Sequence, residues 1–475
     1  MNLSRAAFVL ILALVPFSSS FSKGVSPWLP VNQSPLFEND IEKLAAVTGI
    51  ARLKRPYSLA LIQQKLPKIK NSHPALYRRL DKALMQYQNT GSITHSRLTF
   101  KQNDQSNNVN FHKAIPNAYG TSIEDEIEFS AQGIWQPSPW YGFYAGVSAT
   151  DNDINPAGST FSFGLDWAQI DIGYKNHWWS PFQGSAKMIS THAPTMPSIS
   201  MENSAPLELF GLGVDYELFI AQMSRQPVLY QGVYNNADKP LLSGVHLGIR
   251  PTEWFSLGFN RMFQFGGGER PLSLGTLARA LFDPRGADND ASVDEESGNQ
   301  IASIVSKINF EDFVVSAELA GEDTSNNKAW QLGNTAITVG LFVPSLFSDT
   351  TSLTYEYSEW QKGWYINNVY DFGYVHEGNI IGDAYLQDPH LNQSALPGSS
   401  HYLKSIYQHR HGHAISFSIA SYDFIDETNI LETGFTADVE YSHSTQFGSV
   451  FAGANGGKDS YGEDFLQVRI GWQWK

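Results

Sequence analysis

The residues from His177 to Ser180 combine side chains that suit sugar binding. The flat apolar face of the indole of Trp178 or Trp179 matches the C–H face of a pyranose ring. The imidazole of His177 and the hydroxyl of Ser180 can exchange hydrogen bonds with sugar hydroxyls. The stretch that they open, 177–206, holds four prolines and no sustained helical or strand period. Because so long a connection without secondary structure is uncommon and usually functional, the sequence predicts ligand binding by these four residues.

The two tryptophans also have a purely structural use. Neighbouring residues of an extended segment point in opposite directions, so only one of Trp178 and Trp179 can stack on a given ligand. A large indole can equally wedge a loop into a wall or a plug. The sequence therefore leaves open whether the stretch 177–206 fills a hole or holds a ligand, and direct sugar contact is expected more at loop tips.

Two groups of residues raise the question of a bound metal ion. His409, His411 and His413 alternate and could ligate a transition metal from one face, but Gly412 indicates a turn that separates them. The acidic run from Asp288 to Glu296 offers the oxygen ligands that calcium prefers, but it lacks the spacing of an EF-hand. We therefore expect no metal and no cofactor, with calcium at the acidic run as the one exception to test.

Motifs for catalysis are missing from the sequence. Glu124, Glu126 and Glu128 would share one face of a strand, whereas a glycosidase needs two carboxylates on opposite sides of the bond that it cleaves. The sequence contains no G-x-S-x-G nucleophile elbow and no helical His pair of the metalloprotease kind. It therefore predicts a protein that is not an enzyme.

The first 22 residues have the layout of a secretory signal peptide. Arg5 precedes an apolar run, 6–17, and mostly small residues follow it. The run is too short to span a bilayer. We expect cleavage between Ser20 and Lys23, which removes one cation and no carboxylate and takes the net charge from −15 to −16.

The composition of the exported chain favours an outer-membrane β-barrel. Charged residues make up 17% of the chain and aromatic residues 13%, against roughly 25% charged residues in ordinary soluble domains. The mean hydropathy is still slightly polar, at −0.27, as expected for strands with one face in lipid and one in a polar lumen. The absence of cysteine excludes a lipid-anchored N-terminus and disulfides. The negative charge excludes nucleic acid as a partner, since phosphates would be repelled.

Residues 23–90 are predicted to be helical. One helix begins at Pro35, where a proline suits the first turn. A second begins after Ser58 and ends at Pro67, and Ser72 caps a third. The apolar stripes of these helices need a partner surface. We expect a periplasmic segment that caps the barrel, although a separate folding unit with no blocking role fits the same pattern.

From about residue 91 onward, apolar and polar residues alternate with the period of a β-strand. The clearest runs are 168–174, 255–260, 313–320, 353–358 and 415–420. The final run, 466–474, has tryptophans at its tip and resembles the closing strand that the barrel-assembly machinery of the outer membrane reads, although Lys475 follows it. At roughly ten residues per strand plus loops, residues 91–475 predict an all-β transmembrane barrel of about 18 antiparallel strands.

A barrel of this size leaves an aqueous channel unless something fills it. Three long stretches without a strand pattern are candidates to fill the lumen: 177–206, 266–298 and 376–400. The expected organisation is therefore a signal peptide (1–22), a helical segment that caps the barrel (23–90) and a barrel with long plugging loops (91–475).

The motif HWWSPF at 177–182, continued by PTMPS at 194–198, resembles the capsule-assembly Wzi family of outer-membrane proteins. The stretch LKRPY at 53–57 is similar to the family too, and the order of signal, helical segment and barrel matches over nearly the whole mature chain. The resemblance implies an 18-stranded barrel closed by an N-terminal helical bundle and by extracellular loops. It further implies a lectin without enzymatic activity that attaches capsular polysaccharide to the cell.

Three functions remain open at this point. The first is a monomeric lectin for capsular or extracellular polysaccharide, held in the lipid and lipopolysaccharide of the bacterial outer membrane. The second is a channel for oligosaccharides or other small solutes, which requires a continuous polar lumen. The third is an outer-membrane hydrolase, which requires a catalytic grouping that the sequence does not show.

Overall fold

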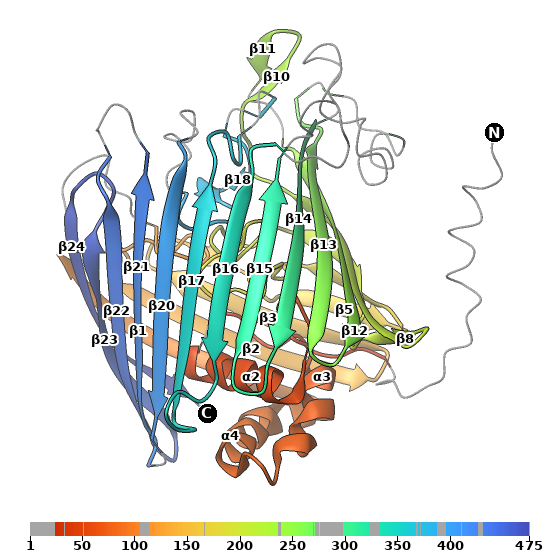
Figure 1. Cartoon of the computed structure of the whole chain (residues 1–475), viewed down its shortest axis with the longest axis vertical. Coiled ribbons are helices and arrows are strands. Elements are labelled where there is room, and N and C mark those ends of the chain that lie inside the picture. The colour runs from red at the N-terminus through yellow and green to blue at the C-terminus, as the bar shows by residue number, and fades with distance from the viewer. Residues whose placement is uncertain are drawn as a thin grey trace.

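Figure 1 shows the computed structural model of the chain, a closed barrel with helices at one end and long loops at the other. We call these the helix end and the loop end. The structure describes residues 24–474 except 33, 51, 105–113, 166, 236–238, 269, 271–274, 276–297, 323–332, 367–368, 371, 387–395, 410 and 426–430. The predicted signal peptide and the acidic run from Asp288 to Glu296 lie outside the described residues. Within the described part of the chain, no helix is both long and apolar enough to cross a bilayer.

Among the described residues, eighteen strands form the barrel wall, each antiparallel to its two neighbours. They are β1 (Gly91–Asp104), β2 (Ile127–Ser138), β3 (Tyr141–Thr150), β5 (Thr160–Gly164), β6 (Gln169–Gly173), β7 (Ser198–Glu202), β9 (Leu212–Gln222), β12 (Leu241–Thr252), β13 (Phe255–Phe265), β14 (Gly298–Asn309), β15 (Val314–Gly321), β16 (Ala336–Val343), β17 (Thr351–Trp360), β20 (Gly398–Gln408), β21 (His413–Phe424), β22 (Gly434–Ser444), β23 (Gly448–Lys458) and β24 (Asp464–Trp474). Strand β1 pairs with β24, with Ser96 opposite Trp474, and this pairing closes the barrel. The predicted fold class and strand number are confirmed.

Six shorter strands lie beside the wall or in the loops. Strand β4 (Ile154–Asn155) pairs with β3, and β8 (Leu207–Leu209) pairs with β9. The strands β10 (Val228–Tyr230) and β11 (Val233–Asn235) form a ribbon at the loop end (Figure 1), and β18 (Val375–His376) pairs with β19 (Asn379–Ile380). The loop end is thus the more elaborate of the two.

The alternation of polar and apolar residues places polar side chains on the inner face of the wall and apolar side chains on the outer face. On β9 the carboxylates of Asp215 and Glu217 are buried, while Leu218 and Ile220 on the other face are partly exposed. Exposed aromatic residues cover the outside of the barrel, among them Phe129, Trp135, Phe143, Phe161, Phe259, Tyr355, Phe417 and Tyr441. Four exposed tryptophans lie in turns or strand ends at the helix end: Trp140, Trp167, Trp254 and Trp474. An apolar band with aromatic residues at its edge is typical of a barrel in a membrane.

The helical unit lies beneath the barrel (Figure 1) and consists of α2 (Pro35–Thr48), α3 (Leu59–Lys65), η1 (Leu66–Ile69), α4 (Pro74–Leu84) and η2 (Met85–Gln88). Pro35 occupies the first turn of α2, and Gly49 ends that helix in the left-handed region, at φ 64°. The side chain of Ser58 caps α3. Helix α4 begins at Pro74, one residue later than a cap at Ser72 would place it, because the fixed φ of proline suits the first helical position.

The helices pack against one another and against the end of the barrel. Leu80 of α4 belongs to an apolar cluster that also contains Ile134 of β2 and Tyr144 of β3. The hydroxyl of Ser352 on β17 donates to Oδ1 of Asn39 on α2, at 2.7 Å. The helical unit is therefore attached to the barrel through both apolar and polar contacts.

Replacing Leu80 by alanine should loosen the helical unit without opening the barrel. The Leu80 side chain is fully buried, and such truncations cost about 2–5 kcal/mol of stability. Limited proteolysis in detergent should cut the helical unit of the variant faster and leave the barrel intact. The control Met85→Ala alters a half-exposed residue of η2 and should match the wild type. Equal cleavage of Leu80→Ala and the wild type would contradict this packing.

Candidate functional site

The connection between β6 and β7 fills the lumen. We call residues 174–197 the plug loop and residues 52–57, which precede α3, the strap. The side chains of Trp178 and Trp179 in the plug loop are completely buried. The backbone N–H of Arg55 donates to the carbonyl of Trp178 (2.8 Å), and the N–H of Trp178 donates to the carbonyl of Arg55 (3.2 Å). The strap and the plug loop therefore lie side by side as an antiparallel pair.

The carboxylate of Glu217 on β9 joins the plug loop to the strap. Its Oε1 accepts hydrogen bonds from Nζ of Lys175 and from Nδ1 of His177, both at 2.7 Å. Its Oε2 accepts from Nζ of Lys54 in the strap (2.8 Å) and from Nε1 of Trp179 (3.0 Å). One buried carboxylate thus accepts four hydrogen bonds, two of them from the sequence motif.

The charges around Glu217 are paired with one another. Lys54 and Lys175 also contact the carboxylate of Glu202 on β7. Nη2 of Arg52 lies 3.5 Å from the same carboxylate. Burial alone would lower the pKa of Lys175, but Glu202 and Glu217 raise it above its ordinary value. Buried charges are stable only when paired, so this network holds the plug loop in place.

Both nitrogens of the His177 imidazole have hydrogen-bond partners within the protein. Burial lowers the pKa of His177, and the nearby charge of Lys175 lowers it further, so the ring is neutral. Because a carboxylate only accepts hydrogen bonds, the ring proton lies on Nδ1 facing Glu217. The Nε2 atom lies 3.2 Å from the hydroxyl of Ser198, which can donate to it. Both ring nitrogens therefore have partners inside the protein.

The structure brings the four predicted ligand residues together, but deep in the plug. The exposed fraction is 4% for His177 and 0% for Trp178, Trp179 and Ser180. The hydroxyl of Ser180 donates to Glu318 on β15, at 3.2 Å. A ligand would reach them only after the plug loop moved. Sugar contact by His177, Trp178, Trp179 and Ser180 stays a prediction. The contacts that these residues make in the structure hold the plug loop in place.

A second loop, residues 361–386, packs on the plug loop. Nζ of Lys187 forms an ion pair with the carboxylate of Asp383, and both side chains are buried. The hydroxyl of Ser185 donates to Oδ1 of Asp383, at 2.6 Å. The hydroxyl of Tyr365 donates to a carbonyl of the plug loop. The two loops are therefore joined by charge and by hydrogen bonds.

Of the three stretches predicted to fill the lumen, one is described in full and two only in part. The stretch 177–206 supplies most of the plug loop, and residues of 376–386 belong to the same apolar cluster inside the barrel. Residues 387–395 and most of the stretch 266–298 lie outside the described residues. The plugging observed here thus comes from the first stretch and from part of the third.

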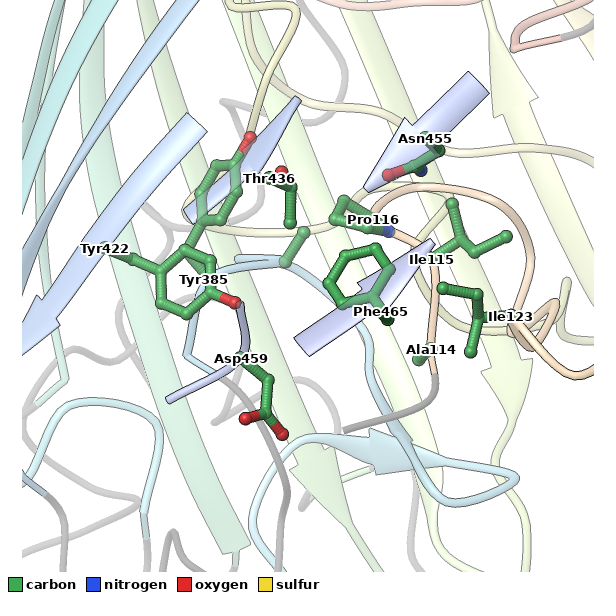
Figure 2. Close-up of a pocket in the computed structure, with 11 residues that line it drawn as sticks. Ala114, Ile115, Pro116, Ile123, Tyr385, Tyr422, Thr436, Asn455, Asp459 and Phe465 are labelled. Carbon is green, nitrogen blue, oxygen red and sulfur yellow. The ribbon is translucent and has the colours of Figure 1, made fainter. Parts of the chain in front are cut away.

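Among the described residues, a hollow lies at the loop end, with an empty volume of about 460 Å³ that includes space open to solvent. The apolar residues that line it are Ala114, Ile115, Pro116, Ile123, Ala384 and Phe465 (Figure 2). The tyrosines Tyr385 and Tyr422 and the polar residues Thr436, Asn455 and Asp459 complete the described lining. Strands β21 to β24 supply four of these residues near their ends at the loop end. We call this hollow the loop-end pocket.

The loop-end pocket combines ring faces with hydrogen-bonding groups. The rings of Tyr385 and Tyr422 lie 6.0 Å apart and are inclined by 26°. Phe465 is only partly buried, so its ring can meet a ligand. Within the described residues, Oδ1 of Asn455 has no hydrogen-bond partner. Rings beside amide and hydroxyl groups provide the stacking and hydrogen bonding that a sugar requires.

The histidines 409, 411 and 413 and the glutamates of the stretch 124–128 are not brought together as a site in the described residues, and the acidic run 288–296 lies outside them. His409, His411 and His413 lie at a turn at the helix end, and the ring centre of His409 is 4.9 Å from that of His411 and 6.5 Å from that of His413. In the described ranges, no group of three or more His, Asp or Glu side chains is placed to hold a metal ion. Glu128 pairs with Lys101 at 2.6 Å, so it faces a cation and not a second carboxylate.

The loop-end pocket and the Glu217 network were missed by sequence reasoning. Alternation along β22 and β23 places Thr436 and Asn455 on the lumen side, as it does for many residues of the wall. It does not reveal which wall residues stay uncovered when the loops fold inward. A polar lumen residue close to a strand end at the loop end is the one usable signal.

These features define the class of protein as a closed antiparallel β-barrel with its own loops packed inside the lumen and with a pocket at the loop end. An apolar outer band surrounds the wall. The chain belongs to the capsule assembly protein Wzi family, whose family model matches residues 89–405. The resemblance carried by the HWWSPF and PTMPS motifs is thereby confirmed.

Solved structures extend the comparison. Wzi of Escherichia coli, described as an outer membrane protein involved in group 1 capsule assembly and as a carbohydrate binding β-barrel, is 15% identical, with a TM-score of 0.67, over 93% of this chain and 98% of that chain. OccK5 (OpdH) of Pseudomonas aeruginosa is 8% identical, with a TM-score of 0.45, over 81% and 96%. OccAB4 of Acinetobacter baumannii is 10% identical, with a TM-score of 0.44, over 80% and 96%. No curated protein matches the chain.

Proposed function

We propose that the protein is an outer-membrane barrel that binds carbohydrate and helps to hold or organise capsular polysaccharide on the bacterial surface. Membership of the capsule assembly family supports this function. The described Escherichia coli structure, which shares the fold over nearly the whole chain, binds carbohydrate. In the outer membrane, the helical segment caps the barrel on the periplasmic side, and the loop end faces the outside of the cell.

A filled lumen beside an open pocket is the observation that carries the proposal. The buried groups that hold the plug loop are paired with one another, which suits a stable plug and opposes the alternative function as a channel for oligosaccharides. We also propose that the protein performs no catalysis. Among the described residues that line the loop-end pocket, Asp459 supplies the one carboxylate, whereas a glycosidase needs two.

The proposed partners follow from the surfaces of the barrel. The loop end binds capsular or extracellular polysaccharide, and the apolar band contacts outer-membrane lipid and lipopolysaccharide. The closing strand β24 is the element that the barrel-assembly machinery would recognise. Because a closed barrel has no free sheet edge, we propose that the protein works as a monomer. We propose that it needs no cofactor, with calcium at the run 288–296 as the exception to test.

Cells that lack the protein should release their capsule into the medium, and the wild-type gene should restore it. Phe465→Ala should restore it poorly, because the loss of a partly exposed ring from a sugar site weakens binding about tenfold. The amount of cell-bound polysaccharide measures both effects. Phe447→Ala, which removes an exposed ring at the helix end, should act as the wild type. EDTA should leave binding by the purified protein unchanged, and a loss with EDTA would indicate the calcium site. A deletion strain with normal cell-bound capsule would overturn the proposed function.

A further inference from the structure

The helical unit carries positive charge in a chain that is otherwise acidic. Residues 59–90 hold six lysines and arginines and one carboxylate, that of Asp81, so their net charge is +5. The whole chain has a net charge of −15, which leaves −20 for all its other residues. Such an asymmetry between two parts of one chain indicates a partner of the opposite charge. The helical unit is therefore suited to an anionic partner.

Two of the six cations face carboxylates of the protein itself. Nε and Nη2 of Arg79 donate to the carboxylate of Asp40 on α2, both at 2.7 Å. Burial lowers the pKa of Lys65, and the carboxylates of Glu253 and Glu208 act in the opposite direction. Arg79 and Lys65 therefore belong to the packing of the helical unit, and four cations remain for a partner.

These four cations are exposed, and we call them the basic face: Lys68, Lys70, Arg78 and Lys82. Within residues 59–90, all of which the structure describes, the one ion pair is that of Arg79 with Asp40. Nζ of Lys70 lies 5.7 Å from the centre of the Tyr77 ring, which places this charge beside α4. The four cations outnumber the nearby carboxylate of Asp81 by three. The basic face thus keeps its positive charge.

Helix α4 turns its charges away from the barrel. Leu76 and Leu80 are buried, one turn apart. Arg78 and Lys82 each follow one of these leucines by two residues, which is about 200° around a helix, so they project from the opposite side. Figure 1 shows α4 below α2 and α3, on the side away from the barrel. With the helical unit on the periplasmic side, the basic face points into the water of the periplasm.

The surroundings of the basic face do not suit a lipid surface or a protein. Turns of the wall at the helix end carry the exposed carboxylates of Glu253, Glu311 and Asp312, which would repel anionic headgroups. A helix that binds a bilayer presents an apolar face to it, and a protein interface has an apolar core. Met85 is the one large apolar side chain that residues 59–90 expose. A water-borne polyanion is the partner that matches this surface.

We propose that the basic face binds peptidoglycan, the acidic polymer of the periplasm. Its glycan strands carry short peptides whose carboxylates recur along the polymer. The long side chains of lysine and arginine reach such carboxylates as separate, rotatable charges. This inference goes beyond the proposed function and shares with it only the orientation in the outer membrane. The barrel is then tied to the cell wall at the helix end, while polysaccharide binds at the loop end.

Co-sedimentation with isolated, insoluble peptidoglycan tests the proposal, with the mature protein in a neutral detergent. The wild type should sediment at low salt and much less at high salt, because salt screens exposed charges. Chitin, an insoluble glycan without carboxylates, should leave the protein in solution. Arg78→Gln combined with Lys82→Gln should weaken binding to peptidoglycan about tenfold, because each exposed ion pair contributes up to about fivefold.

Arg225→Gln combined with Lys362→Gln is the matched control, because it removes one arginine and one lysine that are exposed at the loop end. It should sediment as the wild type does, and both double variants should keep the wild-type midpoint of heat denaturation. Equal sedimentation of the two double variants, or of the wild type with chitin and with peptidoglycan, would overturn the inference.

A lipid surface is the other outcome to separate. Protein held in nanodiscs of zwitterionic lipid is mixed with vesicles that contain phosphatidylglycerol. Binding to these vesicles without binding to peptidoglycan would overturn the inference and assign the basic face to anionic lipid. Loss of peptidoglycan binding with normal cell-bound capsule would leave the proposed function intact. Peptidoglycan binding by a protein that binds no capsular polysaccharide would support the inference and overturn the proposed function.

Discussion

Replacing Glu217 by alanine should release the plug loop and turn a nearly silent barrel into a conducting one. The substitution removes the acceptor of four hydrogen bonds between 2.7 and 3.0 Å long. It leaves Lys54 and Lys175 to share the single carboxylate of Glu202. Removing one partner of a buried ion pair costs about 3–5 kcal/mol. We therefore expect a lower midpoint of heat denaturation and frequent channel openings in planar lipid bilayers.

Glu208→Ala is the matched control for this experiment. Glu208 lies on β8, next to β9, but its side chain is 59% exposed, and it pairs with Arg250 at the surface, at 2.8 Å. Exposed pairs of this kind contribute roughly 0.2–1 kcal/mol, so this variant should remain silent and nearly as stable as the wild type. If Glu217→Ala is as silent and as stable as its control, the network does not hold the plug. Steady conductance by the wild type would instead favour the channel function.

The period-two alternation was sufficient to predict the wall of the barrel. Lipid on one side and a polar lumen on the other impose the same requirement on every strand, so the pattern recurs wherever a strand is long. The predicted runs 353–358 and 415–420 fall inside β17 and β21. The strands β5 and β7 have five residues each, and so short a run carries little periodic signal, although the predicted run 168–174 contains the equally short β6. The strand number followed from the chain length, whereas the strand ends did not.

The site was harder to predict because its residues are brought together by the plug. His177 and Glu217 are 40 positions apart in the sequence. The alternation of polar and apolar residues along β9 does not distinguish Glu217 from the other residues that face the lumen. The paired tryptophans indicate an unusual loop, but an indole suits a buried anchor as well as a sugar platform. The loop-end pocket draws on residues from Ala114 to Phe465, and no local pattern records which of them remain uncovered.

Lys187→Met should weaken both the stability of the barrel and its binding of polysaccharide. The side chains of Lys187 and Asp383 are 1% and 0% exposed, and methionine leaves the carboxylate of Asp383 without a counter-charge. The expected cost is about 3–5 kcal/mol. Oδ1 of Asp383 also accepts from the backbone N–H of Tyr385, at 3.2 Å, and Tyr385 lines the loop-end pocket. A shift of Asp383 should therefore move this ring, which heat denaturation and polysaccharide binding should both register.

Adding Asp383→Asn to Lys187→Met separates the charge from the packing. The new amide keeps an oxygen that can accept from Ser185 and Tyr385, but it removes the unpaired charge. The double variant should recover most of the lost stability and binding, because a buried pair replaced as a whole is often tolerated. Lys362→Met, an exposed position of the same loop, should change stability by less than about 0.5 kcal/mol. If the two changes at the buried pair instead add their costs, packing and not charge holds Tyr385 at the pocket.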